Sequence, residues 1–415
     1  MRLRIKDFAT KVGSGVTPKG GASVYQDNGI PLFRSQNVTN DGFLLDDIAY
    51  ISEEIHKSMI GTRLMPNDVL LNITGASIGR CYYLPKNFKE GNVNQHVCII
   101  RPKGNVLPAF LYYNLISAKG QHMIDLCQTG ANREGLTKEN ICNFEFDIPP
   151  LETQQRMVTY LDTKLSEIDH QVAILTSKRD AYLRLKKSII NHAVTRGLDP
   201  NVKMKDSGVE WIGEVPEHWK TCRFKDAFRR WTTGITPDSK NYKYFESDIN
   251  KGYTWVTISD FSKKYISQSN LNLSDESIKL FMPSLSLKGS LMFSFKLSVG
   301  KIAFADKDLY TNEAIVSIPP NNRQCLDYYY YLLPKVLHEN ATENIYGAKM
   351  LNQKIIANML MVIPPLPEQH AIATYLDDKC AKIDTIVSNL NKQISRYGDL
   401  KRSLIDEVIT GKRAV

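Results

Sequence analysis

The chain has 415 residues, 42% hydrophobic and 23% charged, which is the composition of a folded protein with length for two globular domains. No apolar run approaches the ~18 residues of a membrane span, and the first residues lack the apolar core of a signal peptide, so we expect a cytoplasmic protein that contacts no membrane. The scattered, odd-numbered cysteines argue against a disulfide framework or a zinc site, whereas a net charge of +9 favours polyanions such as nucleic acid.

Residues 1–147 are expected to form a globule with a β-sheet core. Short apolar runs with a strand-like composition, at 69–73 and 97–100, are broken by Gly, Pro, Asn and Asp. The aromatic run at 110–113 is better explained by a helix packed on the sheet than by residues that stack on a flipped base.

Residues 148–197 are expected to form a long helix. No Pro or Gly occurs from Leu151 to about Val194, and apolar residues recur at alternating steps of three and four. Such a seam predicts a coiled-coil helix on the order of 65 Å long. Pro149-Pro150 ends the preceding strand, and Gly197 lies near the helix end. The predicted seam consists of Leu161, Leu165, Ile168, Val172, Leu175, Tyr182, Ile189 and Ala193.

A linker at 198–220 leads to a second β-rich globule at 221–362, which repeats the first one faintly. The segment FKDAFRRWTTGITP, from Phe224, aligns with IKDFATKVGSGVTP, from Ile5. The aromatic run at 328–331 likewise echoes the one at 110–113. The two globules therefore share a frame but differ in most of their residues.

Residues 363–415 repeat the first helix in register and without a gap. The stretch IPPLETQQRMVTYLDTKLSEID, from Ile148, returns as IPPLPEQHAIATYLDDKCAKID, from Ile363, and roughly 20 of about 50 aligned positions are identical. Mutual antiparallel packing of the two helices is the simplest arrangement, and self-association through the same seam is the alternative. Lys186 and Lys401 interrupt the two seams at matching positions. The basic clusters Lys186-Lys187 and Lys401-Arg402 could contact DNA phosphates or acidic partner surfaces, or form a solvent-exposed helix face.

The contrast between the repeats carries functional information. Two similar helices are expected where both must pair with each other and with a common partner, whereas two dissimilar globules are expected where each reads a different sequence. A pseudo-two-fold protein of this kind suits a DNA site that is split into two half-sites.

The order globule–helix–globule–helix, the IPPLxEQ helix start and the linker SGVEWIGEVPEHW resemble the specificity subunit of type I restriction–modification systems over essentially the whole chain. This resemblance implies an α+β fold, in which 1–147 and 221–362 are target-recognition domains and the helices form an antiparallel coiled coil. It implies that each domain reads one half of a bipartite, asymmetric site in double-stranded DNA. It further implies that the helices set the spacer and dock two methyltransferase subunits, through which restriction subunits join.

The first copy departs from this pattern at the helix start. Thr153 stands where the second copy has Glu368, and Glu152 stands where it has Pro367. We therefore expect a local difference in the turn that begins the helix.

Catalytic motifs are poorly supported. The segment 75–79, GASIG, satisfies the pattern of a nucleophile elbow around Ser77, but a strand-like segment follows where that elbow needs a helix. A glycine-flanked turn between strands explains it better, and a metal-free turn explains Pro237-Asp238-Ser239-Lys240. S-adenosylmethionine and ATP motifs are absent from the sequence. We expect a non-catalytic chain without a metal or cofactor of its own, whose partner subunits use S-adenosylmethionine, ATP and Mg.

The candidate DNA contacts are Lys, Arg, Asn, Gln, Ser and Thr side chains in the loops that the globules share, because these groups suit base edges and phosphates. In the first globule they are Lys11, Ser14, Thr17, Lys19, Arg34, Ser35, Gln36, Asn37, Arg80, Asn94, Gln95, Asn132 and Arg133. In the second they are Arg229, Arg230, Thr233, Thr236, Lys240, Lys296, Lys301, Asn312 and Lys349.

Two alternatives stay open from the sequence. The first is a specificity subunit of a related system with one fused modification–cleavage partner, and the second is a coiled-coil adaptor whose globules bind protein. The dependence of binding on salt concentration distinguishes the adaptor from a DNA reader. The affinity for DNA falls steeply as the salt concentration rises, because binding releases counterions from the phosphates.

Overall fold

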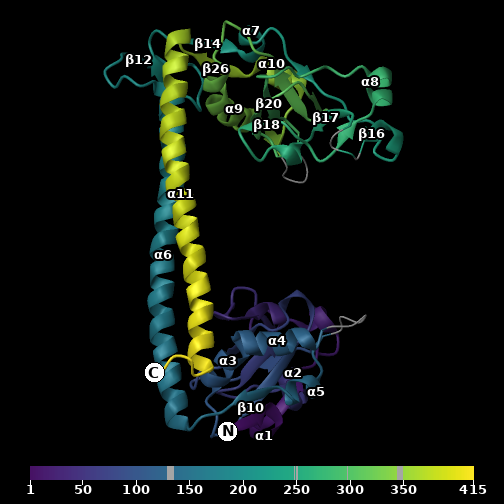
Figure 1. The fold of residues 1–415 in the computed structure, drawn as a ribbon, viewed down its shortest axis with the longest axis vertical. Coiled ribbons are helices and arrows are strands. Elements are labelled where there is room, and N and C mark those ends of the chain that lie inside the picture. Colours follow the sequence, from purple (N-terminus) through teal and green to yellow (C-terminus); the bar gives the residue numbers. More distant parts are fainter. Residues whose placement is uncertain (129–134, 247, 249–250, 297, 344–348) are drawn as a thin grey trace. The chain divides into compact units, whose positions relative to one another are not determined.

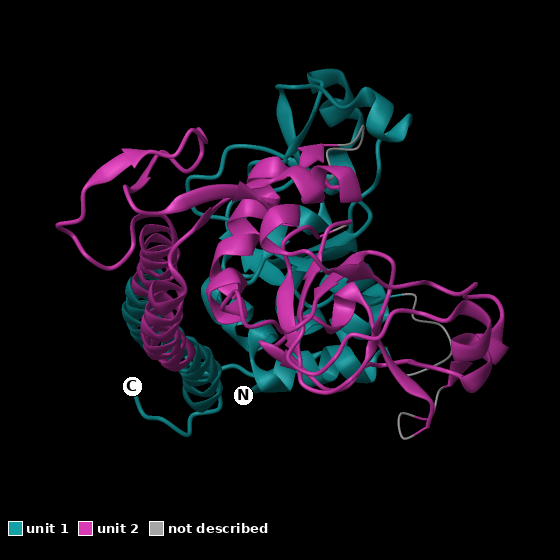
Figure 2. Cartoon of the chain, turned by 90° about the horizontal axis from the view of Figure 1, so that it is seen from above, with its two compact units in different colours: residues 1–177, 390–415 teal, residues 178–389 magenta. Residues whose placement is uncertain are grey.

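The computed structural model describes residues 1–128, 135–246, 248, 251–296, 298–343 and 349–415. The chain divides into two compact units, residues 1–177 with 390–415 and residues 178–389 (Figure 2). Each unit contains one globule and part of both long helices (Figure 1).

The unit 1 globule is built on a four-stranded antiparallel sheet of order β2-β10-β7-β8, with a three-stranded sheet β6-β3-β9 beside it. Its strands are β1 (Arg2–Arg4), β2 (Ala9–Ser14), β3 (Ile30–Phe33), β4 (Val38–Thr39), β5 (Gly42–Phe43), β6 (Ala49–Ile51), β7 (Val69–Asn72), β8 (Cys81–Tyr83), β9 (Asn92–Val93), β10 (Val97–Pro102) and β11 (Glu145–Asp147). Its helices are α1 (Ile5–Phe8), α2 (Glu53–Ser58), α3 (Pro108–Ile116), α4 (Ala118–Leu126) and α5 (Lys138–Cys142).

The unit 2 globule repeats this plan with a five-stranded sheet, β15-β23-β20-β21-β18, and a four-stranded sheet, β16-β19-β17-β22. Its strands, with those of the linker, are β12 (Met204–Asp206), β13 (Glu214–Pro216), β14 (Lys220–Arg223), β15 (Thr232–Thr233), β16 (Phe245–Glu246), β17 (Tyr253–Val256), β18 (Tyr265–Ile266), β19 (Asn272–Leu273), β20 (Leu291–Ser294), β21 (Ile302–Ala305), β22 (Tyr310–Thr311), β23 (Ile315–Ile318), β24 (Thr342–Glu343), β25 (Lys349–Met350) and β26 (Leu360–Ile363). Its helices are α7 (Phe224–Ala227), α8 (Asp275–Phe281), α9 (Leu326–Asn340) and α10 (Gln353–Asn358).

The β-runs and the aromatic runs that the sequence singles out are confirmed. The runs at 69–73 and 97–100 lie in the paired strands β7 and β10, and their counterparts in unit 2 lie in β20 and β23, which are also antiparallel neighbours. The aromatic runs lie in α3 and α9, whose buried faces join the core of each globule.

The helix pair consists of α6 (Leu151–Arg196) and α11 (Leu366–Ile409), which lie side by side and antiparallel (Figure 1). In unit 1, Leu161 and Leu165 near the start of α6 share a core with Leu404 and Val408 near the end of α11. In unit 2 the reverse holds, because the end of α6 packs against the start of α11. The predicted antiparallel coiled coil and α+β fold are therefore confirmed.

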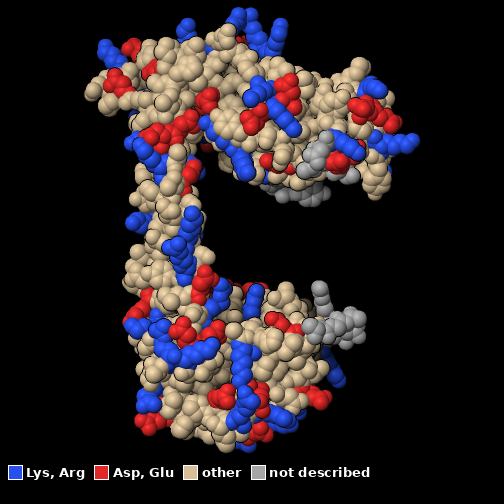
Figure 3. Space-filling view, in the orientation of Figure 1, with Lys and Arg blue, Asp and Glu red and all other residues tan. Residues whose placement is uncertain are grey.

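The two seam lysines form matching ion pairs across this helix pair. Lys186 Nζ lies 2.7 Å from Asp384 Oδ1 in unit 2, and Lys401 Nζ lies 2.8 Å from Asp169 Oδ1 in unit 1. The sequence alignment that matches Ile148 to Ile363 also matches both lysines and both aspartates. Lys186 and Lys401 thus each bind the opposite helix, and side chains of both charges lie on the surface of the helix pair (Figure 3).

The difference between the two helix starts has a physical cause in unit 2. The linker folds as the hairpin β12–β13, and it ends in the fully buried Trp219. The Trp219 indole N–H donates to Glu368 Oε2 at 2.8 Å, and the same oxygen lies 2.9 Å from His218 Nε2. Glu368 therefore attaches the linker to α11, and Thr153 has no carboxylate for such a contact.

Across the described residues, neither long helix nor any shorter one combines the length and the apolar character that crossing a membrane requires.

Candidate nucleic-acid interface

Hydrogen bonds gather four unit 1 turns at one edge of the sheet β2-β10-β7-β8. The turn after β2 is bound to the neighbouring strands, since Gly15 N donates to Val97 O and Val16 N to Val93 O. The β7–β8 turn joins through Ile73 N, which donates to His96 O in the turn before β10. The segment after β3 joins through Asn72 Nδ2, which donates to Ser35 O at 2.7 Å.

Most candidate residues of unit 1 lie on these turns. The exposed ones at this edge include Ser14, Lys19, Arg80 and Gln95. Thr17 and Ser35 are half-buried there. The structure therefore brings together candidates that are far apart in the sequence, although contact of their side chains with DNA stays a prediction.

In other unit 1 candidates, the polar atoms of the side chain form hydrogen bonds within the protein. Asn37 is 1% exposed, and its Nδ2 donates to Leu44 O and Asp47 O. Asp47 also binds Arg34 Nη2 through its backbone oxygen, at 2.7 Å, and accepts a short hydrogen bond from Gln36. Asn94 is buried and accepts from His96 N. Asn37 and Asn94 are thus buried and each stabilises a turn, so their side chains are bound within the protein, and contact of either one with DNA stays a prediction.

Lys11 also departs from the predicted cluster. On the adjacent strands β2 and β10, Lys11 lies opposite Arg101, three residues away from the edge where Ser14 lies. Its Nζ donates to Gly61 O at 2.6 Å, and burial together with the Arg101 charge lowers the Lys11 pKa. The candidates Asn132 and Arg133 lie outside the described residues.

Unit 2 has an equivalent edge, formed by the turns after β15, after β20 and before β23. Ile235 N donates to Thr311 O, Phe295 N to Ala314 O, and Lys301 Nζ to Ile258 O at 3.2 Å. Six candidates lie on these turns or on the loop that follows β15: Thr233, Thr236, Lys240, Lys296, Lys301 and Asn312. The Asp238–Lys240 segment is a turn in which Asp238 Oδ1 accepts from Lys240 N, so the turn predicted at Pro237-Asp238-Ser239-Lys240 is confirmed.

Three unit 2 candidates lie elsewhere. Arg229 and Arg230 are exposed but lie before β15, whereas the turn follows that strand, and Arg230 aligns with Lys11. The Lys349 ammonium lies within 3.2 Å of both His338 ring nitrogens at the end of α9.

A glycine in each globule allows the first turn to approach the sheet. A Cβ atom at Gly15 would lie 1.9 Å from Val93 O, and one at Gly234 would lie 1.7 Å from Thr311 O. No side chain fits at either distance. The matched glycines of SGVTP and TGITP are thus explained by the close backbone packing that builds both edges.

Sequence reasoning missed Thr74 and His96, which meet at the unit 1 edge. Thr74 Oγ1 lies 2.5 Å from His96 Nδ1, and Gln95 Nε2 lies 3.1 Å from His96 Nε2. The segment VNQHVCIIRP, from Val93, aligns with TNEAIVSIPP, from Thr311, so that His96 stands opposite Ala314 and has no counterpart in the second globule.

A second basic surface lies within unit 2, in a groove between the end of α6 and α9. Its floor includes Val194, Ile302 and Tyr330, and its basic residues include Arg184, Lys187, Lys335 and His338. Lys187 and Arg184 are exposed, whereas burial and the nearby Lys187 lower the Lys335 pKa despite the attraction of Glu339. This surface adds cations to unit 2 beyond those on the turns.

The hydrolase interpretation of GASIG lacks the required geometry. The segment forms a single 3-10 turn, Gly75–Ser77, between β7 and β8, with no helix after Ser77. Among the described residues, His, Cys, Asp and Glu side chains form no cluster of three or more that could hold a metal ion.

Comparison with known proteins gives a consistent result over the whole chain. The sequence model of the type I restriction modification DNA specificity domain matches residues 1–175 and 216–396, once in each half. The putative type I restriction enzyme MjaX specificity subunit of Methanocaldococcus jannaschii is 21% identical, over 98% of this chain and 92% of the relative. The EcoKI specificity subunit of Escherichia coli strain K12 is 22% identical, over 96% of this chain and 86% of the relative.

Solved structures share the fold. A chain from a structural study of complex assembly and conformational transition in a type I R-M system superimposes with a TM-score of 0.77 at 14% identity, covering 99% of this chain and 97% of its own. The HsdS subunit from Thermoanaerobacter tengcongensis gives 0.55 at 15% identity, covering 100% and 97%. With two matched domains, an antiparallel helix pair and relatives along its full length, the chain belongs to the type I restriction–modification specificity subunit family.

Proposed function

We propose that this chain is the non-catalytic DNA-recognition subunit of a type I restriction–modification complex, in which each globule reads one half of a bipartite, asymmetric site. The observation that carries this proposal is the equivalent edge of polar and basic turns in two globules of unlike sequence. Lys19 and Arg80 supply cations at one edge, and Lys296 and Lys301 supply them at the other. Major-groove base edges and phosphates are the groups that such side chains recognise.

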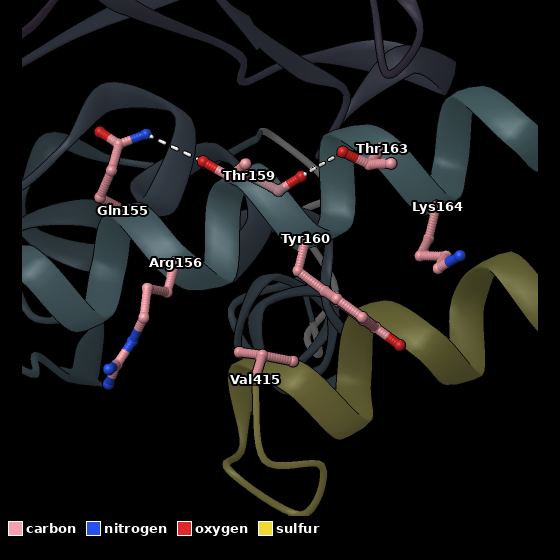
Figure 4. Close-up of a pocket in the computed structure, with 7 residues that line it drawn as sticks. All are labelled: Gln155, Arg156, Thr159, Tyr160, Thr163, Lys164 and Val415. Atoms are coloured by element: carbon pink, nitrogen blue, oxygen red, sulfur yellow. Dashed lines mark hydrogen bonds between the residues drawn. The ribbon is translucent and has the colours of Figure 1, made fainter.

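The helix pair is suited to hold two copies of one partner, the methyltransferase subunit. In unit 1, Tyr160 of α6 lies in an open hollow with Arg156, Lys164 and Val415, and its side chain extends toward the end of α11 (Figure 4). In unit 2, the aligned Tyr375 lines a hollow with residues of the end of α6. Two related tyrosine-lined hollows on matched helices support docking of two identical subunits.

The division of labour follows from this arrangement. The partner subunits would supply methyl transfer with S-adenosylmethionine, and restriction subunits that join through them would use ATP and Mg. The target-recognition domains would be residues 1–147 and 221–362, and the helices at 148–197 and 363–415 would set the spacer between half-sites. The setting in which DNA, the cofactors and all subunits meet is the cytoplasm.

Methylome sequencing tests the proposal directly. A host without restriction–modification genes would express the chain alone, a type I methyltransferase subunit encoded with it alone, or both, and long-read sequencing would map methylated bases. We expect one split motif with a fixed spacer, only in the strain that expresses both proteins. Methylation by the chain alone would contradict a non-catalytic role, and methylation that does not depend on the chain would contradict the recognition role.

The adaptor alternative predicts a different salt response. For a DNA reader, the affinity of the assembled complex for its motif should fall linearly with salt on logarithmic axes, with a slope of about −0.9 for each phosphate contact. An affinity for DNA that is weak and insensitive to salt would favour an adaptor that binds protein.

A further inference from the structure

Each globule is attached to the helix pair at an equivalent carboxylate. In unit 1, the Tyr113 hydroxyl on α3 donates to Asp162 Oδ1 on α6 at 2.5 Å. In unit 2, the Tyr331 hydroxyl on α9 donates to Asp377 Oδ1 on α11 at 2.6 Å. The alignment of the helices matches Asp162 to Asp377, and the aromatic runs match Tyr113 to Tyr331.

In unit 2, a lysine from the globule strengthens this contact. Lys264 Nζ lies 2.7 Å from Asp377 Oδ1 and 3.4 Å from Asp327 Oδ1. Its ammonium also lies between 5.0 and 5.8 Å from four ring centroids, those of Tyr265, Phe304, Tyr330 and Tyr331. Burial opposes the charge, but the hydrogen bond and charge of Asp377 outweigh it, so that the Lys264 pKa is raised. The cation therefore ties several parts of the globule to one point on α11.

In unit 1, the polarity of the additional contact is reversed. Lys401 belongs to α11, and its Nζ lies 3.2 Å from Asp41 Oδ1 in the β4–β5 turn of the globule. The Tyr112 hydroxyl holds the same turn by donating to Asn40 O at 2.5 Å. Each globule thus carries one hydrogen bond from a tyrosine and one ion pair to the helices. We call these two pairs of contacts the latches: Tyr113–Asp162 with Asp41–Lys401, and Tyr331–Asp377 with Lys264–Asp377.

We propose that the latches fix the orientation of each globule on the helix pair and that they thereby help to determine the spacer length between the half-sites. The apolar cores also join globule and helices, but apolar contact has little directional preference, whereas hydrogen bonds and ion pairs hold specific geometries. Successive base pairs are only about 3.4 Å apart. A globule that tilts slightly on its helix can therefore meet a half-site displaced by one base pair. This inference rests on the proposed DNA-recognition function.

The test uses the chain expressed with its methyltransferase partner, and the measurement is the distribution of spacer lengths among methylated motifs. Lys264→Met removes the charge but keeps an apolar stem among the rings. Lys263→Met, at the exposed neighbouring position, is the matched control, and Lys264→Arg keeps the cation. We expect Lys264→Met to raise methylation at spacers one base pair longer or shorter about tenfold relative to the native spacer, equivalent to about 1.4 kcal/mol of lost preference. Both half-site sequences should stay the same.

A role in stability alone would give a different pattern. If Lys264→Met lowers the midpoint of thermal unfolding but leaves the spacer distribution unchanged, the inference is wrong. Asp41→Asn provides the same test in unit 1, where the side chain is 82% exposed and folding does not depend on its burial. Broader spacers in Lys264→Met and Asp41→Asn, with native spacers in Lys264→Arg and Lys263→Met, would support it. If the native chain directs no split motif at all, the proposed function fails, and this inference fails with it.

Discussion

A buried glutamine near the start of each long helix provides the sharpest test of how the globules are joined to the helix pair. Gln369 in α11 is 1% exposed and makes three hydrogen bonds. Its Oε1 accepts from Cys325 N at 2.9 Å, and its Nε2 donates to Pro364 O at 2.9 Å and to Gln324 Oε1 at 3.0 Å. The side chain therefore connects the first turn of α11 to the start of α9.

The change Gln369→Ala removes all three hydrogen bonds, and two of the three partner atoms then have no other hydrogen bond among those described here. Gln324 Oε1 still accepts from the Tyr329 hydroxyl, whereas Cys325 N and Pro364 O lose the bonds described above. Each unsatisfied buried backbone group costs about 1–3 kcal/mol. For two such groups, we therefore expect the free energy of unfolding of unit 2 to fall by about 2–6 kcal/mol.

The assay exploits the tryptophans, because all four, Trp211, Trp219, Trp231 and Trp255, belong to unit 2. Urea unfolding followed by tryptophan fluorescence therefore reports on unit 2. His370→Ala, at the exposed next position, is the control and should change the free energy of unfolding by less than about 0.5 kcal/mol. Equal transitions for Gln369→Ala and His370→Ala would refute the assignment of this glutamine as a structural connector.

The isosteric change Gln369→Glu tests the direction in which stability changes with pH. A carboxylate can accept from Cys325 N, but it faces the oxygens of Pro364 and Gln324 without a proton to donate. The folded state should therefore raise the pKa of the new Glu above about 4.3, its unfolded value. Since the protonated form is favoured by folding, stability is highest below that unfolded value and is lost as pH rises through the folded pKa. A variant that gains stability as pH rises would contradict this geometry.

Three further predictions concern binding and pH. Arg80→Ala should weaken DNA binding by the assembled complex and make its salt slope shallower by about 0.9 if Arg80 binds a phosphate, whereas Lys11→Ala should leave both unchanged; fluorescence anisotropy at several salt concentrations measures this. Tyr160→Ala and Tyr375→Ala should each reduce the number of bound methyltransferase subunits from two to one, and together to none, as measured by light scattering of the complex. Burial lowers the Lys401 pKa, but hydrogen bonds and charges from Asp169 and Asp41 outweigh this effect, so that the pKa is raised. Lys401→Met should therefore lower the free energy of unfolding at any pH below ~10.5, and the difference from the native chain should vanish as the pH rises above that value.

The helices could be predicted closely because a repeated period is a local signal. Leu161 and Leu376 are fully buried, as the seams predict, and α6 ends at Arg196, immediately before Gly197. The paired β-runs were also predictable, since four-residue apolar runs bounded by turn residues have few other uses in a globule. These features depend on residues that are neighbours in the sequence.

The chemistry between distant residues could not be predicted in the same way. Lys186 was recognised as an interruption of the seam, but its partner Asp384 is almost two hundred positions away, and only the antiparallel pairing brings them together. Asn37 has the residue type of a base-reading side chain, yet its amide binds the Leu44 and Asp47 carbonyls. Residue type defines what a group can bind, whereas the fold decides which partner reaches it first.

The comparison of the two latches shows where the symmetry of the chain ends. The helices present the same aspartate and the same lysine near both globules, Asp162 with Lys401 in unit 1 and Asp377 with Lys186 in unit 2. Unit 1 uses its lysine to hold Asp41 of the globule, whereas unit 2 uses its aspartate to hold Lys264. Because the attachment points match while the globules that use them differ, an asymmetric DNA site requires no asymmetry in the helices. We therefore expect the differences that select bases to lie in the globules, at the two edges of turns.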